Sequence, residues 1–403
     1  MKSSLKSSFK YIAGGAIIIA SLLDNANAIP AFARQMGVTC SVCHSENGYP
    51  ALTRFGREFK ASGYTMVGSE KLIGGGKTLS DKLISLPSAL NMSVVGGASI
   101  NGGDGSTPTT VATDDGFGVF LGGRINEHIG TFVEMDYNGG GNGGTFSLNN
   151  FLVPITYKVG ENYYGIEPYF TDGHTTDVSG FFGDGDNGHE AVSEIGARDT
   201  YGAKGLSLYD FNPNYFINYV VWANGNQDST GTKFANYFRV AYTPQVGIWD
   251  LEFGARYFTG TTNLANDNIV VPGQYVTTDA YSMDFNAMGK VSNMPLHIGM
   301  SYADAEWKPN SLFTTNSDHK DGTSFVFDTK LGVIPRTLVA MVHYTYDDHV
   351  QDSNDKVKTT QLALRYFITE NAHVQPYYDI ISGNSGGNGA NDNAYGVDFE
   401  VAF

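Results

Sequence analysis

Cysteine is scarce in this sequence, and its scarcity removes whole classes of protein. The 403 residues include only two cysteines, so a secreted fold held together by a disulfide framework is excluded. Charged residues are also few, at 16% of the chain against about 25% in ordinary soluble proteins. Acidic residues outnumber basic ones by 41 to 25, giving a net charge of −16. This balance argues against nucleic acid as a partner and favours cations.

After the first thirty residues the chain has no long apolar run. None of the later runs reaches the ~18 residues that a membrane-spanning helix needs. At the start of the chain, Lys2, Lys6 and Lys10 precede an apolar run at 12–23, and small residues end it at Ala28. This is the pattern of a secretory signal peptide. We therefore expect residues 1–28 to be removed and the mature chain to be exported without a transmembrane helix.

The sequence is rich in glycine, tyrosine and phenylalanine, and its apolar and polar residues alternate over long stretches. From residue 88 onward apolar and polar residues alternate with period two, most clearly in GIWDLEFGARYF, QLALRYFI and AYGVDFEVAF. Strands of about 10 residues with one apolar and one polar face are typical of transmembrane β-barrels. A secreted all-β domain is the alternative interpretation.

The connections support the barrel independently, because short turns and long polar loops alternate along the chain. Short turns are expected near Asn126, Gly160, Asn212, Gln245, Asn293, Pro335 and Asn371. Long loops are expected near 100–114, 138–145, 171–194, 223–233, 259–279, 305–322, 347–357 and 382–392. Eight long loops predict about 16 strands with both chain ends at the periplasmic side. The terminal aromatic residue, Phe403, is typical of barrels that are assembled into the bacterial outer membrane.

Both cysteines lie in the segment TCSVCHSE, residues 39–46. The spacing C-x-x-C-H is the attachment sequence for haem c, in which two thiols bind the porphyrin edge and the histidine binds iron. Cys40 and Cys43 are thus the predicted attachment residues and His44 the predicted axial ligand. A redox dithiol is the alternative, but no βαβ pattern surrounds the motif. Export of the chain agrees with haem attachment, which takes place outside the cytoplasm.

The second axial ligand is open. Between residues 29 and 127 His44 is the only histidine, so a nearby ligand would be a methionine. Met66 is our prediction and Met36 is treated as a packing residue. A histidine of the barrel wall, His297 or His343, and an open iron position are further alternatives.

The segment PAFARQMGVTCSVCHSENGYPALTRFGREFKASGY resembles the head of the fused outer-membrane monohaem cytochrome–porins of iron-oxidising bacteria. The likeness covers about 35 residues and rests on FARQ, Gly37, the haem motif, Pro50, Leu52, FG at 55–56, FK at 59–60 and Gly63-Tyr64. The resemblance implies an iron(II) oxidase whose barrel holds the cytochrome at the cell surface. It also implies that Cys40, Cys43 and His44 hold the haem, and it carries over no iron-binding residue.

These observations predict four segments: a signal peptide at 1–28, a monohaem cytochrome segment at 29–66, a linker at 67–87, and an outer-membrane barrel at 88–403. About 40 residues cannot enclose a haem with a core of their own, whereas a barrel of about 16 strands has an aqueous lumen. We therefore expect the partly helical cytochrome segment to plug the lumen. Outer-membrane lipid surrounds the barrel, and homo-oligomers such as trimers are open.

The long loops carry carboxylates and histidines, which suit Fe(II). The residues concerned are Asp172, His174, Asp177, Asp184, Asp186, His189, Glu190, Glu194, Asp304, Glu306, Asp318, His319, Asp321, Asp347, Asp348 and His349. Solvation and turn formation in outer loops explain them better, and GDGDNG at 183–188 could equally hold calcium or no ion. An iron site in these loops is therefore the weaker of the two interpretations.

Three functions follow. The first is oxidation of extracellular Fe(II) through one haem c, with electrons passed to a periplasmic carrier such as a soluble cytochrome c. The second is an electron conduit of the same build for another donor or acceptor. The third is a diffusion porin whose haem is structural or sensory. No hydrolytic triad or phosphate-binding glycine pattern is present in the sequence.

Overall fold

The computed structural model describes residues 31–45, 48–68, 72–74, 85–88, 91–103, 109–138, 144–171, 202–225, 231–266, 269–314, 318–349, 356–383 and 393–403. The expected signal peptide and the loop residues 172–194 lie outside these ranges. Among the helices within them, none has both the length and the apolar character needed to cross a membrane.

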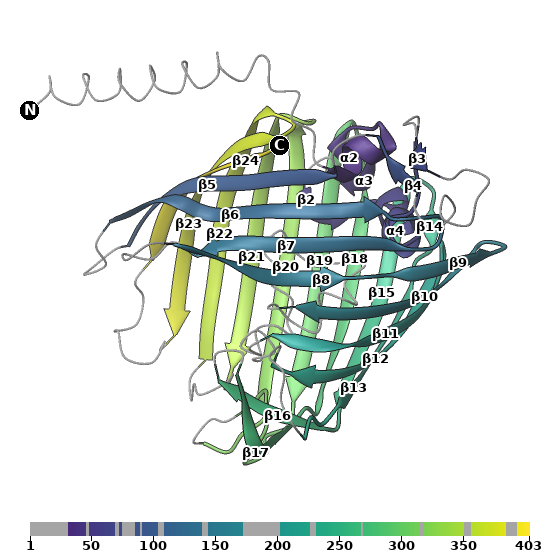
Figure 1. The fold of residues 1–403 in the computed structure, drawn as a ribbon. Coiled ribbons are helices and arrows are strands. Elements are labelled where there is room, and N and C mark those ends of the chain that lie inside the picture. Colours follow the sequence, from purple (N-terminus) through teal and green to yellow (C-terminus); the bar gives the residue numbers. More distant parts are fainter. Residues whose placement is uncertain are drawn as a thin grey trace, which may run out of the picture.

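Most of the chain forms one closed antiparallel barrel (Figure 1). β8 and β9 both pair with β10, and β13 and β14 both pair with β15, so each couple counts as one strand and the barrel has sixteen. The predicted fold class is confirmed. The elements are β5 (Met92–Gly103), β6 (Thr110–Arg124), β7 (Gly130–Asn138), β8 (Thr145–Leu152), β9 (Ile155–Val159), β10 (Asn162–Thr171), β11 (Ala203–Asn212), β12 (Tyr215–Asn224), β13 (Ala235–Tyr242), β14 (Gln245–Val246), β15 (Trp249–Thr259), β18 (Ala280–Val291), β19 (Met294–Ala305), β20 (Gly322–Ile334), β21 (Leu338–Asp348), β22 (Lys356–Thr369), β23 (Ala372–Gly383) and β24 (Ala394–Ala402).

The last strand closes the barrel on the first. β24 runs antiparallel to β5, from Ala394 opposite Gly103 to Ala402 opposite Val95. The terminal residue extends this pairing, because Phe403 and Val94 exchange two backbone hydrogen bonds of 2.7 and 2.8 Å. Closure leaves no unpaired strand edge, which a sheet in lipid cannot tolerate.

Short and long connections fall at opposite ends of the barrel, as predicted. The short ones are 125–129, 160–161, 213–214, 247–248, 292–293, 335–337 and 370–371. Each contains an expected turn residue or lies within two residues of one, and the eight remaining connections join the opposite strand ends. In outer-membrane barrels short turns face the periplasm, so this end is the periplasmic one. The hairpin of β16 (Thr261–Asn266) and β17 (Ile269–Thr277) lies at the other end, at the bottom of Figure 1.

The barrel is apolar outside and polar inside. On β22 the outward residues Leu364 and Tyr366 are 48% and 52% exposed, whereas Arg365 between them points inward and is 5% exposed. β15 repeats this with Phe253 exposed and Glu252 buried. Large apolar side chains on the exterior are stable only where lipid replaces water. The chain is therefore an outer-membrane barrel whose outer wall contacts lipid.

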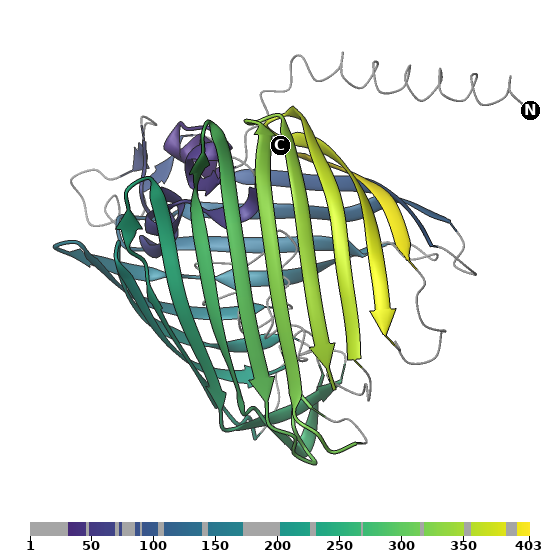
Figure 2. The same ribbon diagram turned by 180° about the vertical axis from the view of Figure 1, so that it is seen from behind.

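The N-terminal segment lies inside the barrel mouth at the short-turn end. It consists of α2 (Ala31–Met36), α3 (Cys40–Cys43), β1 (His44–Ser45), β2 (Gly48–Leu52), α4 (Arg54–Ala61) and the residues 62–68 that follow, and we call it the plug. Both views show its helices at the end opposite β16 and β17 (Figures 1 and 2). β3 (Leu72–Gly74) and β4 (Ser85–Pro87) then form a small hairpin before β5 begins at Met92.

Candidate functional site

The haem-binding motif forms a single helical turn. α3 begins after Thr39, whose backbone is extended, and it ends at His44, which is again extended and whose N–H donates to the carbonyl of Cys40. Residues three apart on a helix share one face, so the two cysteines project to the same side of the turn. Both thiols are half-buried, and neither is in a disulfide.

Helix α4 holds this turn in place. The Thr53 side chain accepts a hydrogen bond from the Gly56 N–H at 3.1 Å, which caps the helix. The same hydroxyl donates to the Val42 carbonyl at 2.6 Å, and the Thr53 N–H donates to the Cys43 carbonyl at 2.9 Å. At Gly56 the two backbones almost touch, because a Cβ there would lie 2.0 Å from the Cys43 carbonyl oxygen. Only glycine fits this contact.

Burial reinforces the protonated form of the two thiols. It raises the pKa of Cys43 to about 11, and the neighbouring Cys40 adds to this rise. The pKa of Cys40 is also raised, first by burial and then by the charge of Glu370 at the β22–β23 turn. The pair is therefore neutral dithiol at physiological pH. Two neutral thiols on one side of a turn, with an imidazole in the next residue, are the donor set that haem c requires.

The two candidate methionines belong to one apolar cluster. Met36 is buried and Met66 half-buried, and both pack with Phe59 and Tyr64 of the plug and with Phe132 of β7. The carbonyl of Met66 accepts a hydrogen bond of 2.6 Å from the Gln35 side chain. Met66 and Met36 thus share one apolar cluster at the base of the plug. The role of Met66 as an iron ligand stays a prediction.

The two barrel histidines, His297 and His343, lie on the inner face of the barrel wall. His297 on β19 is 1% exposed; its Nε2 lies 3.2 Å from Asn286 Oδ1 and its Nδ1 lies 3.8 Å from Asp328 Oδ2. His343 on β21 pairs across the strands with Asp328. The second ligand stays a prediction for these histidines as it does for Met66.

The plug is fixed to opposite sides of the barrel. On one side, Arg57 of α4 is 1% exposed and forms a 2.5 Å ion pair with Asp250 of β15. Tyr209 of β11 and Thr156 of β9 donate hydrogen bonds to the carbonyls of Ala61 and Ser62, at 3.0 and 2.7 Å. These contacts seat α4 against β9, β11 and β15.

Gln35 of α2 fastens the other side. Its amide nitrogen donates to the carbonyls of Tyr64 and Met66, both at 2.6 Å, and its carbonyl oxygen accepts from the Arg124 N–H of β6 at 3.1 Å. Gln35 has no exposed surface, and it lies in the FARQ element of the resemblance. The plug therefore bridges the mouth from β6 to β15.

The long-loop carboxylates are largely paired with lysines or with backbone groups. Asp348 contacts Lys356 at 2.7 Å and also His349, whose Nε2 lies 3.2 Å from Lys320. The other members behave likewise: Glu306 pairs with Lys308, Asp318 lies near Lys320, and Asp321 accepts from the Trp307 N–H. Within the described ranges no group of three or more His, Cys, Asp or Glu residues is arranged to hold a metal ion. The carboxylates and histidines between 172 and 194 lie outside those ranges.

Several residues that position the site were not predicted from the sequence. The contacts of Gln35 and Arg57 join positions 89 and 193 residues apart, which no local pattern displays. Thr53 could have been found, because a threonine before a helix-forming stretch is a capping signal. Nothing in the sequence around Gly56 indicated that its backbone packs against the backbone of Cys43.

Comparison with known proteins identifies the fold. No family model and no curated protein matches the sequence. Solved porin structures do match: OprB of Pseudomonas putida, in its high-pH form, has 12% identity and a TM-score of 0.54 over 78% of this chain and 94% of that chain. An anion-selective porin from Comamonas acidovorans has 13% identity and a TM-score of 0.51 over 78% of this chain and 99% of that chain. The likeness at this identity concerns the outer-membrane barrel alone.

Proposed function

We propose that this chain is an outer-membrane cytochrome–porin that oxidises extracellular Fe(II) through a single haem c and passes the electrons to a periplasmic carrier. The observation that carries the proposal is the placement of the C-x-x-C-H turn. It lies on a plug inside the barrel mouth, at the end where the turns are short. A haem held by this turn would lie between the lumen and the periplasm.

The residues of the plug have separate roles in holding haem c. Cys40 and Cys43 would bind the haem covalently, His44 would ligate its iron, and Met66 is our proposal for a second ligand. Thr53 and Gly56 fix the position of the turn against α4, and Arg57 and Gln35 fix the plug against the barrel. Haem c, when bound, supplies reversible one-electron transfer.

The barrel decides how iron reaches the plug. β20 has 13 residues, which at ~3.3 Å each and a tilt of 35–45° span roughly 30 Å. Electron transfer falls steeply with distance, so an ion that stayed outside the loops would be too far from the plug. Fe(II) must therefore enter the lumen, where it loses one electron to become Fe(III). The net negative charge of −16 favours the entry of a cation.

The position of the plug also defines the partner. A periplasmic carrier such as a soluble cytochrome c approaches the mouth that the plug occupies, so the electron leaves on the side where the turns are short. We also propose a homo-oligomer, such as a trimer, as the assembly.

The test is anaerobic stopped-flow absorbance of the oxidised, detergent-solubilised protein mixed with Fe(II). Rapid appearance of the reduced haem α-band supports the proposal, and adding an oxidised soluble cytochrome c should then restore the oxidised spectrum. A Cys40→Ala/Cys43→Ala variant is the matched control for the optical signal. If dithionite reduces the haem and Fe(II) does not, iron is the wrong donor and the conduit for another donor replaces this proposal. Solute conductance through the intact protein in a planar bilayer would instead favour the diffusion porin.

A further inference from the structure

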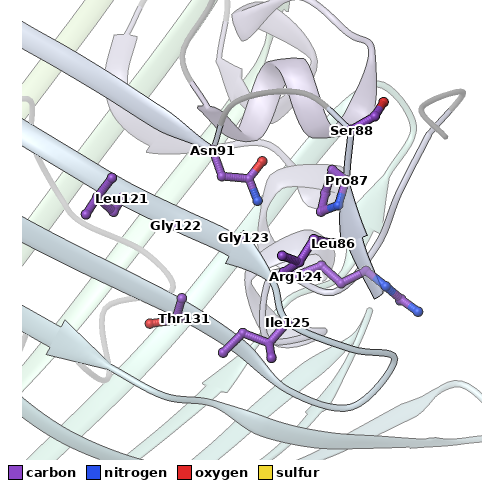
Figure 3. A pocket seen from close by; sticks show the side chains of 10 residues that line it. All are labelled: Leu86, Pro87, Ser88, Asn91, Leu121, Gly122, Gly123, Arg124, Ile125 and Thr131. Atoms are coloured by element: carbon purple, nitrogen blue, oxygen red, sulfur yellow. The ribbon is translucent and has the colours of Figure 1, made fainter. Parts of the chain in front are cut away.

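An apolar pocket of about 450 Å³ lies between the β3–β4 hairpin and the end of β6. Figure 3 shows Leu86 and Pro87 of β4 on one side and Leu121 of β6 with Thr131 of β7 on the other. The β6 side is the outer face of the barrel. Gly122 faces inward, since a Cβ there would lie 2.9 Å from the Phe32 ring of the plug, so Leu121 beside it faces outward.

The pocket is continuous with the lipid-facing wall. Leu121 is 38% exposed, and the hairpin adds Leu72 and Leu86 at 41% and 40%. The pocket lies at the short-turn ends of β6 and β7, where a barrel passes from hydrocarbon into the headgroup region. Apolar surface at this level would meet water unless something covers it.

Arg124, the last residue of β6, lines the same pocket. Its Nε donates to the carbonyl and hydroxyl of Ser85 at 3.2 and 3.0 Å, and its Nη1 donates to the Thr65 carbonyl at 2.8 Å. These acceptors are neutral. In the part of the chain that the structure describes, no carboxylate lies within ion-pair distance of Arg124. The adjacent Glu127 contacts His128, and its charge acts on Arg124 without a direct ion pair. Among the described residues the guanidinium at the edge of the pocket therefore has neutral hydrogen-bond acceptors and no direct ion pair.

We propose that this pocket binds one phospholipid of the periplasmic leaflet, with an acyl chain between β4 and β6 and the phosphate at Arg124. An apolar pocket with one cation at its edge matches the chemistry of an anionic amphiphile. The neighbouring wall already contacts lipid, so the ligand needs no separate source. The bound lipid fastens the β3–β4 hairpin, and through Ser85 and Thr65 the end of the plug, to the membrane surface.

The experiment uses the full-length protein, delipidated in detergent micelles and titrated with palmitoyl-oleoyl phosphatidylglycerol under native mass spectrometry. Wild type should bind one lipid saturably. Thr131→Trp, which fills the pocket, should lose this binding. Arg124→Gln should weaken it about fivefold, the effect of one cation at a membrane surface, and Arg124→Lys should restore it. Leu208→Trp, on the lipid-facing side of β11, is the matched control and should bind as wild type does.

Folding is checked for every variant by the heat-modifiable migration typical of closed barrels. The proposal is wrong if Thr131→Trp retains the lipid, or if Leu208→Trp loses it equally, because binding then has no specific place. It is also wrong if the wild type binds no lipid and is an oligomer that Thr131→Trp dissociates, since a second barrel would then occupy the pocket. None of these readings depends on iron oxidation.

Discussion

The Gly56→Ala substitution tests the contact that positions the haem motif. The added Cβ would lie 2.0 Å from the Cys43 carbonyl oxygen and 2.9 Å from its carbon. Carbon and oxygen normally approach to ~3.3 Å, so α3 and α4 must separate by about 1.3 Å. That movement would break the hydrogen bonds from Thr53 to the carbonyls of Cys43 and Val42, now 2.9 and 2.6 Å.

The magnitude follows from two opposing effects. Strain and lost hydrogen bonds destabilise the plug by about 3 kcal/mol. Replacing a helical glycine by alanine stabilises an unobstructed helix by ~1 kcal/mol. The net destabilisation is therefore about 2 kcal/mol, which corresponds to roughly 30-fold faster amide exchange by local opening. Because the two effects have opposite signs, the direction of the change in exchange rate shows which one dominates.

Hydrogen exchange with mass spectrometry is the assay, read on peptides covering residues 39–61. Gly160→Ala is the matched control, since Gly160 also has a single methyl added but lies in the β9–β10 turn at φ +64° with no atom within 4 Å. It should leave exchange of the plug unchanged. If Gly56→Ala slows exchange in 39–61, helix propensity alone has acted and the close approach of α4 to Cys43 is refuted.

Three further outcomes are expected. Cys40→Ala or Cys43→Ala should remove one thioether bond, and the double variant should carry no haem mass in denaturing mass spectrometry; haem still attached to the double variant would contradict the assignment. Arg57→Met leaves Asp250 without its cation and should destabilise the plug by about 3 kcal/mol, the lower end of the range for a broken buried pair because Asp250 is 18% exposed; limited proteolysis within 31–68 measures it, and Lys158→Met, which removes an exposed pair with Glu58, should change it little. Met66→Leu should lower the haem reduction potential in a redox titration, since methionine ligation raises it; an unchanged potential would remove Met66 as the ligand.

The barrel was predictable because lipid imposes a local rule. QLALRYFI alternates in sequence, and its apolar members, Leu362, Leu364, Tyr366 and Ile368, are 42–52% exposed on the outer wall. The pattern is local to a strand and needs no knowledge of its neighbours, although it is weak in a single strand such as β5 and strong only when the strands are taken together. The turns are equally local, and all seven expected short turns join consecutive strands.

The seating of the plug was not predictable, because its contacts join distant parts of the chain. Arg57 reads as an ordinary surface arginine until Asp250 is placed beside it, and Gln35 is one polar residue in a short helix until Arg124 approaches. The long loops give a second example of contacts that the sequence did not reveal. The carboxylates near 347–349 left solvation and cation binding both open, and the lysines that the structure places among them, Lys356 and Lys320, could not be located from the sequence.

The bridging of the mouth by the plug has a consequence for the order of folding. Its partners lie in strands as far along the chain as β15, and Arg57 and Asp250 are separated by 193 residues. Contacts of such sequence separation form only after the entropy of closing the intervening chain has been overcome. Docking of the plug is therefore expected to be a late event that awaits the sheet, and the mouth facing the periplasm would be the last part of the molecule to become structured.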